Sequence, residues 1–108
     1  MNTNNQTPVV VLFGGNPNRR DEVISLINTL GNISVYGTLS EEEGILQVKA
    51  LPKVDLVLIG GRHTDTQRER IRAFIATSLP HAKITEPGWH YPYQNEAIKA
   101  DIKLKLGL

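Results

Sequence analysis

The sequence predicts an α/β domain with a small doubly wound parallel sheet, and two observations predict it. The first is an apolar run that ends in a Gly-Gly pair and occurs twice, as PVVVLFGG at 8–15 and DLVLIGG at 55–61. Continuous Val/Ile/Leu runs are typical of strands buried on both faces, as in parallel sheets. The second is that polar residues and an amphipathic helical pattern follow each run. Each copy therefore makes half of a βαβ unit.

The first half of the chain is predicted to contain two strand–helix units. Val9–Phe13 is the first strand, and Asn18 is the expected N-cap of a helix over Arg19–Leu30. Ile33–Tyr36 is a short second strand. A capping box then opens a helix over Ser40–Leu51, which ends before a proline.

The second half repeats this arrangement. Leu56–Ile59 is the third strand, and a second capping box opens a helix over Thr64–Leu79, with Arg68 among the charged residues of its exposed face. Ala82–Thr85 is a shorter, more polar strand and is expected at an edge of the sheet. A last helix is predicted over Pro92–Leu106, with the proline in its first turn. Its end alternates apolar and polar residues, which also fits a strand.

Four strand–helix units with right-handed crossovers predict one open sheet with the strand order 2-1-3-4 and helices on both faces. The winding direction then changes between the first and third strands, and ligands bind beyond the carboxyl edge of such sheets at that point. We expect residues 8–108 to form a single domain and residues 1–7 to be a disordered, polar N-terminal tail.

Composition excludes several classes of function. Twelve basic and eleven acidic side chains leave a net charge of +1, so no binding to nucleic acid is expected. No apolar run approaches the roughly 18 residues of a membrane span. The polar start is not a signal peptide, so a cytoplasmic location is expected. The chain has no cysteine, which excludes disulfides and thiolate chemistry, and no metal or cofactor motif occurs.

The alternation of strands and helices over Val9–Leu106 resembles a shortened receiver domain of response regulators, within the flavodoxin-like group. Receivers place acidic residues after the first strand, a phosphoacceptor Asp at the end of the third, and a Lys after a later strand. Here the first and third strands both end in Gly-Gly. Asp55 stands at the beginning of the third strand, and Lys83 lies within the fourth. A fifth strand–helix unit is also missing. The resemblance therefore implies a receiver-like domain without phosphorylation residues, acting as a non-catalytic regulatory or protein-interaction module.

A second hypothesis is a site for a small anionic ligand, a nucleotide or a phosphorylated metabolite, where the two Gly-Gly turns meet. Glycine lets backbone N–H groups approach an anion, although it also simply permits a sharp turn. Arg62 follows the second pair and is a candidate partner for the same anion. Neither turn has the spacing of a dinucleotide-binding loop or a P-loop. The candidate ligand-binding residues are Gly14, Gly15, Asn16, Arg19, Gly60, Gly61, Arg62 and His63.

The segment Glu86–Tyr93 contains the only tryptophan and two of the three tyrosines. This concentration indicates either a protein-interaction surface or a cover over the end of the sheet. The last helix carries apolar residues on more than one face, which favours contact with a partner protein or a second copy of the chain. The candidate interface residues are Trp89, His90, Tyr91, Tyr93, Ile98 and Ile102.

A third hypothesis is a small enzyme with a histidine as general base. The predicted topology places His63 and His90 after neighbouring strands, with Asp65 and Glu86 in the same two segments. No nucleophile elbow or paired-carboxylate motif accompanies them. The sequence therefore favours a non-catalytic protein.

Overall fold

The computed structural model describes residues 7–108, so nearly all of the tail predicted at residues 1–7 lies outside the described residues. The sheet has four parallel strands: β1 (Val9–Phe13), β2 (Ser34–Thr38), β3 (Leu56–Ile59) and β4 (Lys83–Thr85). Their order is β2-β1-β3-β4, which confirms the predicted topology. The two strands that end in Gly-Gly, β1 and β3, are the central neighbours, with Phe13 opposite Ile59.

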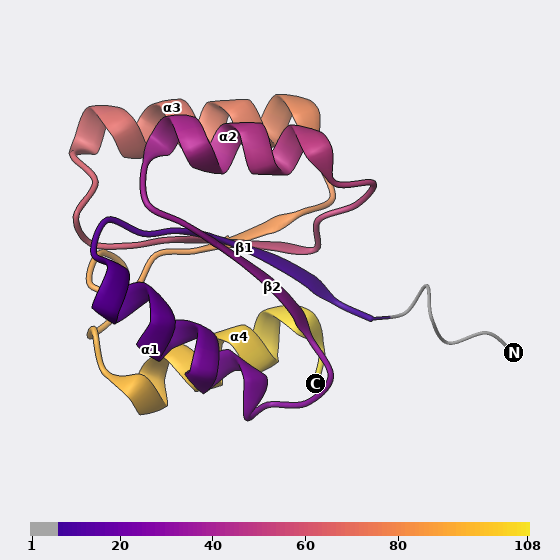
Figure 1. The fold of residues 1–108 in the computed structure, drawn as a ribbon, viewed down its shortest axis with the longest axis vertical. Coiled ribbons are helices and arrows are strands. Elements are labelled where there is room, and N and C mark those ends of the chain that lie inside the picture. Colours follow the sequence, from indigo (N-terminus) through magenta and orange to yellow (C-terminus); the bar gives the residue numbers. More distant parts are fainter. Residues whose placement is uncertain (1–6) are drawn as a thin grey trace, which may run out of the picture.

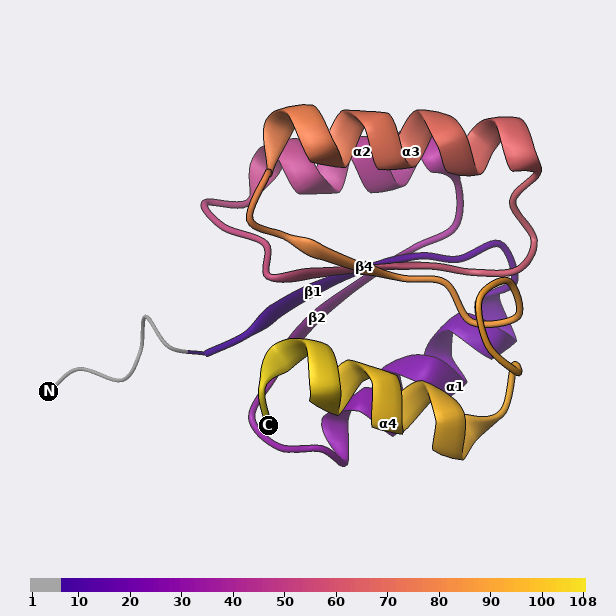
Figure 2. The same ribbon diagram turned by 180° about the vertical axis from the view of Figure 1, so that it is seen from behind.

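Helices cover both faces of this sheet. They are α1 (Pro17–Asn28), α2 (Glu41–Ala50), α3 (Asp65–Ser78) and α4 (Asn95–Leu106). Figures 1 and 2 show α2 and α3 side by side over one face, with α1 and α4 over the opposite face. The predicted α/β class, with a doubly wound sheet, is therefore confirmed.

The central strands divide their side chains between two apolar cores. In β1, Val10 and Leu12 pack with the residues of α1 and α4, whereas Val11 and Phe13 pack with those of α2 and α3. Successive side chains of a strand point to opposite faces, so a strand covered on both sides needs an unbroken apolar run. All four of these side chains are at most 2% exposed. This packing explains the continuous Val/Leu pattern of the sequence.

The first helix begins two residues earlier than predicted. Its N-cap is Asn16, not Asn18, because the Asn16 side-chain oxygen accepts hydrogen bonds from the N–H groups of Asn18 and Arg19 (2.9 and 3.1 Å). Pro17 occupies the first helical position, where a missing N–H leaves no intrahelical hydrogen bond unmade. The choice between the two asparagines is therefore decided by the proline between them.

The last segment is a helix to its end, and two predictions about it were wrong. It begins at Asn95, so Pro92 lies before the helix and not in its first turn. Ile98 and Ile102 are both 0% exposed because they lie one helical turn apart on the face that packs against the sheet. They belong to the core and not to an interaction surface. Leu104, 76% exposed, is the large hydrophobic residue of α4 that remains open to solvent.

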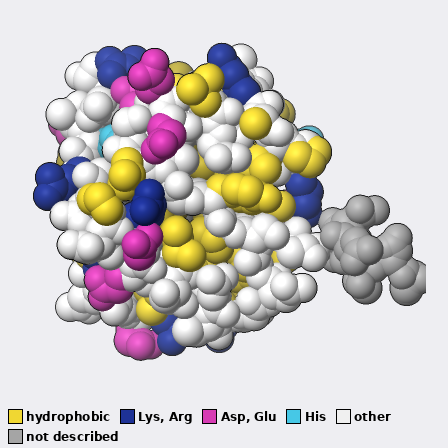
Figure 3. All heavy atoms as spheres, viewed as in Figure 1, with side chains coloured by type: hydrophobic (Ala, Val, Ile, Leu, Met, Phe, Trp, Pro, Cys, Tyr) yellow, Lys and Arg dark blue, Asp and Glu magenta, His cyan; other side chains and the backbone are white. Residues whose placement is uncertain are grey.

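Hydrophobic side chains also gather in the middle of the face shown in Figure 3, where Figure 1 places the edge strand β2. Tyr36 of β2 is 37% exposed, and Leu46 of the adjoining α2 is 62% exposed. This band lies away from the carboxyl-edge turns that follow β1 and β3.

Candidate functional site

A cavity of about 240 Å³ opens at the carboxyl edge of the sheet, between the turns that follow β1 and β3. The winding direction of the sheet changes at this point. Seven of the eight predicted ligand-binding residues line the cavity: Gly14, Gly15, Asn16, Arg19, Gly60, Gly61 and Arg62. Sequence reasoning missed the other lining residues, which are Leu12, Arg20, Val23, Leu58 and Tyr93. We call this cavity the carboxyl-edge pocket.

The first glycine of each pair extends the sheet. The N–H of Gly14 donates to the Thr38 carbonyl (3.0 Å), and the N–H of Gly60 donates to the Phe13 carbonyl (2.9 Å). A Cβ on Gly14 would lie 3.0 Å from the Thr38 carbonyl oxygen, and one on Gly60 would lie 3.2 Å from that of Phe13. This close approach of neighbouring backbones favours glycine at both positions.

The second glycine of each pair leaves a backbone donor at the pocket. Within residues 7–108, the N–H groups of Gly15, Gly61 and Arg62 donate to no protein atom. The start of α1 offers no such donors, because Pro17 has no N–H and the Asn16 side chain accepts from the next two amides. An anion in the pocket would therefore meet the amides of the turns and not those of the helix.

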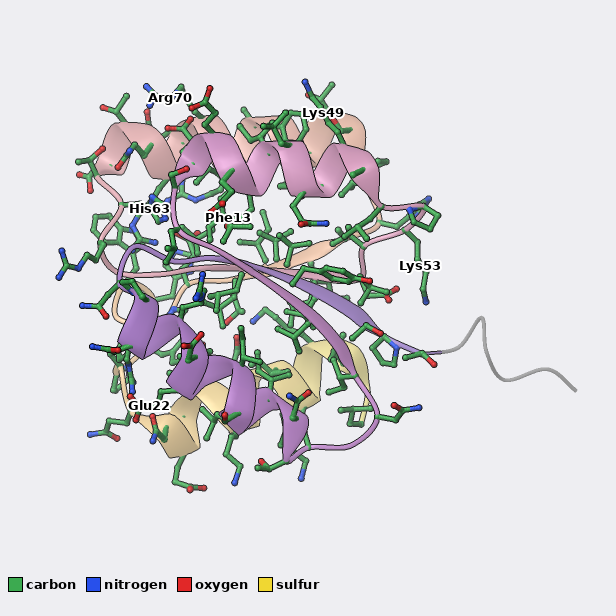
Figure 4. The ribbon with its side chains drawn as sticks, in the orientation of Figure 1. Phe13, Glu22, Lys49, Lys53, His63 and Arg70 are labelled. Atoms are coloured by element: carbon green, nitrogen blue, oxygen red, sulfur yellow. The ribbon has the colours of Figure 1, made fainter. Side chains whose placement is uncertain are left out.

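Arg19 joins the start of α1 to the segment before α4. It pairs with Glu22 of α1 (2.5 Å), a residue labelled in Figure 4, and this hydrogen bond raises the pKa of Arg19. Its Nε donates to the Tyr93 hydroxyl (3.0 Å), and its guanidinium lies 4.5 Å from the centre of the Tyr93 ring. Arg19 therefore lines the pocket, but Glu22 already compensates the charge of its guanidinium.

The other two arginines at the pocket differ in their partners. The Arg20 guanidinium pairs with Asp21 (3.1 Å). Arg62 is exposed and makes no hydrogen bond or ion pair within the described part of the chain. Its side chain lies over Gly15, where an added Cβ would come within 3.0 Å of the Arg62 Cβ. Arg62 therefore presents an uncompensated positive charge beside the two free glycine amides.

The two histidines do not form one site. His63 is 7% exposed, and its Nε2–H donates to the Phe13 carbonyl (3.1 Å). Figure 4 shows both residues between the sheet and the layer of α2 and α3, and His63 does not line the carboxyl-edge pocket. His90 is exposed and lines a different cavity, together with residues of β4 and α4. Its Nε2 lies 3.9 Å from a Glu86 carboxylate oxygen. The position of His63 therefore does not support its prediction as a ligand-binding residue.

The segment Glu86–Tyr93, here called the aromatic loop, connects β4 to α4. Trp89 is 48% exposed, and its ring lies 4.7 Å from the guanidinium of Arg68. The hydroxyl groups of Tyr91 and Thr85 are 2.6 Å apart, and burial raises the pKa of Tyr91 to about 12. Tyr91 therefore fixes the loop to the body of the domain, while the side chains of Trp89 and Tyr93 stay partly open to solvent.

A buried ion-pair network lies beneath the aromatic loop. Arg68, predicted on the exposed face of its helix, is 1% exposed and donates to Glu86 (2.7 Å) and to the Gly60 carbonyl (2.8 Å). Arg72 donates to the other oxygen of Glu86 (2.8 Å). Burial alone would raise the pKa of Glu86, but the hydrogen bonds from Arg72 and Arg68 hold it below its usual value. The prediction for Arg68 was wrong because buried acceptors compensate its charge.

Residues 7–108 contain no group of three or more His, Asp or Glu side chains that could hold a metal ion. None of their helices is both long and apolar enough to cross a membrane.

Comparison with known proteins identifies the fold. No protein-family model matches the sequence, and no curated protein matches it significantly. Among solved structures, a LuxR family DNA-binding response regulator from Silicibacter pomeroyi matches with a TM-score of 0.71 and 14% sequence identity. The match covers 93% of this chain and 91% of that chain. The chain therefore has the receiver-like arrangement that its sequence resembles, and at this identity the likeness concerns the fold alone.

Proposed function

We propose that this chain is a non-catalytic, receiver-like module that binds a small anionic ligand in the carboxyl-edge pocket. The observation that carries the proposal is Arg62, a guanidinium without a protein partner beside the free N–H groups of Gly15 and Gly61. Backbone amides and a guanidinium together suit an anion, since each donates hydrogen bonds and none accepts them. A cavity at the topological switch point of the sheet is the usual place for a ligand in this class of fold.

The sign of the charge distinguishes this pocket from that of a phosphorylated receiver. In receivers, acidic residues follow the first strand and a phosphoacceptor Asp ends the third. Here glycines stand at those points, and arginines line the pocket around them. A ligand-controlled module is consistent with a response regulator of the same fold. It would respond to the presence of a small anion and not to phosphorylation of its own side chain.

Thermal unfolding of the purified protein tests the proposal. The probes are phosphate, nucleotides, sugar phosphates and small carboxylates. A ligand present at 100 times its Kd would stabilise the fold by about 2.7 kcal/mol, which is several degrees in a domain of this size. Arg62→Ala is expected to remove the shift. Arg70→Ala, which deletes an exposed arginine on α3 that pairs with Glu41, is the matched control and is expected to keep it. Shifts that are absent, or unchanged in Arg62→Ala, would contradict anion binding at this pocket.

A second candidate function is protein interaction through the aromatic loop, and the exposure of Trp89 favours it. A tryptophan with 48% of its surface open, next to the exposed His90, resembles the anchors of protein interfaces. Self-association is the form of this interaction that needs no other component. Sedimentation of the parent protein and of Trp89→Ala over a range of concentrations measures it. A dimer that dissociates on substitution supports the candidate, and a monomer in both cases counts against a homodimer.

A further inference from the structure

The walls of the carboxyl-edge pocket define the chemistry of its ligand more closely than charge alone, and this inference rests on the proposed function. The floor of the pocket is hydrocarbon: Leu12, Val23 and Leu58 line it, and each is at most 2% exposed. Tyr93 adds an aromatic wall. A ligand that fills this space must therefore have an apolar body, because a fully hydrated ion would leave the floor in contact with water.

The side chains around the pocket carry one positive charge that no acidic side chain balances. Glu22 compensates Arg19 at 2.5 Å, and Asp21 compensates Arg20 at 3.1 Å. Of the three arginines that line the pocket, only Arg62 remains without an acidic partner in the described residues. A monoanion would balance this charge, whereas a phosphate dianion would leave one negative charge without a partner.

The donors also fit one carboxylate. A guanidinium binds a carboxylate through two parallel hydrogen bonds, and the N–H groups of Gly15 and Gly61 are further donors at the same pocket. An apolar cavity of about 150 Å³ holds a benzene molecule. The volume of about 240 Å³ found here therefore suits one ring or a short branched chain together with its carboxylate.

We propose that the ligand of the carboxyl-edge pocket is a small apolar monocarboxylate. Its carboxylate pairs with Arg62 and with the free amides of the two Gly-Gly turns. Its aromatic or branched aliphatic body lies on Leu12, Val23 and Leu58. The same features disfavour inorganic phosphate and nucleotides, since the first has no apolar body and the second carries several negative charges.

Titration calorimetry with a small set of probes tests this assignment. The probes are benzoate and cyclohexanecarboxylate, their neutral analogue benzamide, inorganic phosphate and adenosine monophosphate. The two acids are expected to bind, and the other three to bind at least 10-fold more weakly. Arg62→Ala is expected to weaken binding of the acids by about 10- to 100-fold. Arg70→Ala, remote from the pocket, is expected to leave binding unchanged.

A second pair of variants tests the apolar floor. Val23→Met extends an unbranched side chain into the cavity and is expected to weaken binding of both acids at least 5-fold. Should the longer side chain disturb folding, Val23→Thr keeps the shape of valine while placing a hydroxyl group on the floor. It is expected to weaken the same probes several-fold, and a circular-dichroism melt of each variant confirms that it is folded.

The outcomes separate this inference from the proposed function. Arg62-dependent binding of phosphate or adenosine monophosphate that is tighter than that of benzoate would overturn the monocarboxylate and leave anion binding intact. Benzamide binding as tightly as benzoate would overturn the role of the charge. A complete lack of Arg62-dependent binding among anions would overturn both proposals.

Discussion

At the scale of single residues, Gly44 shows how closely α2 packs on the sheet. A Cβ at this position would lie 2.2 Å from a carbon of the Phe13 ring. Alanine has a better helix propensity than glycine by about 1 kcal/mol. We nevertheless expect Gly44→Ala to lower the free energy of unfolding by about 1–3 kcal/mol, because the helix or the ring must move. Urea denaturation followed by Trp89 fluorescence measures the change.

Gly61→Ala is the matched control for that substitution. A Cβ at Gly61 meets no atom within 4 Å, so we expect its stability to stay within about 1 kcal/mol of the parent. Equal stability of the two variants would show that the contact with Phe13 does not limit the packing of α2.

The sequence predicted the pocket residues that follow strands and missed those brought in by packing. Gly15 and Arg62 could be placed together because parallel strands bring their carboxyl ends to one edge of the sheet. Val23 and Tyr93 could not, since their positions depend on how α1 meets a segment distant in the chain. The contact between Arg19 and Tyr93 spans 74 residues, and no local pattern reveals it.

At the scale of elements, α3 and the aromatic loop are joined by the buried network of Arg68, Glu86 and Arg72. Arg68→Met would leave a Glu86 carboxylate that is 1% exposed with one remaining arginine. We expect a loss of about 3–5 kcal/mol, the usual result of removing one partner from a buried ion pair. The Arg72 side chain is 37% exposed, so Arg72→Met is expected to have a smaller effect of about 1–3 kcal/mol.

Urea denaturation of both variants measures whether Arg68→Met lowers the free energy of unfolding more than Arg72→Met does. The reverse order would mean that the more exposed arginine contributes most of the stability of the network. Arg68 and Arg72 are four residues apart and therefore lie on one side of α3, which is the only sign of the network in the sequence. The sequence places Glu86 after the fourth strand, but no local pattern shows that its carboxylate accepts hydrogen bonds from both arginines of α3.

The elements themselves were predictable where the pattern is local. Each buried strand has its own apolar run, so the strands needed no knowledge of the fold. The capping box predicted at α3 forms between Thr64 and Gln67. At α2 only half of the predicted box forms, because Ser40 accepts from the Glu43 N–H while the Glu43 side chain accepts from the N–H of Leu39.

The beginnings of α1 and α4 were misplaced where a proline lies near two competing caps or before the helix. At α1 the deciding factor is local, because the proline in the first helical position selects Asn16 as the cap. At α4 the deciding factor is the path of the preceding loop, which depends on tertiary contacts.

At the scale of the whole molecule, stability is expected to fall in acid through Glu86. Burial alone would raise the pKa of Glu86, yet hydrogen bonds from Arg72 and Arg68 lower it. The unfolded chain therefore binds this proton more tightly than the folded protein does. The stabilisation is complete above the ordinary glutamate pKa of about 4.3 and is lost as the pH falls towards the lower folded-state value. Glu22 and Glu41, whose pKa values Arg19 and Arg70 lower, act in the same direction.

Glu86→Gln separates the contribution of the buried carboxylate to acid sensitivity from that of the exposed carboxylates. We expect this variant to be less stable than the parent at pH 7, because two arginines lose a charged partner. Its stability is also expected to decline less steeply between pH 5 and pH 3, with the slope differing by at most about 1.4 kcal/mol per pH unit for one proton. Urea denaturation at a series of pH values measures both slopes. Parallel slopes would assign the acid sensitivity to the exposed carboxylates, which the variant leaves in place.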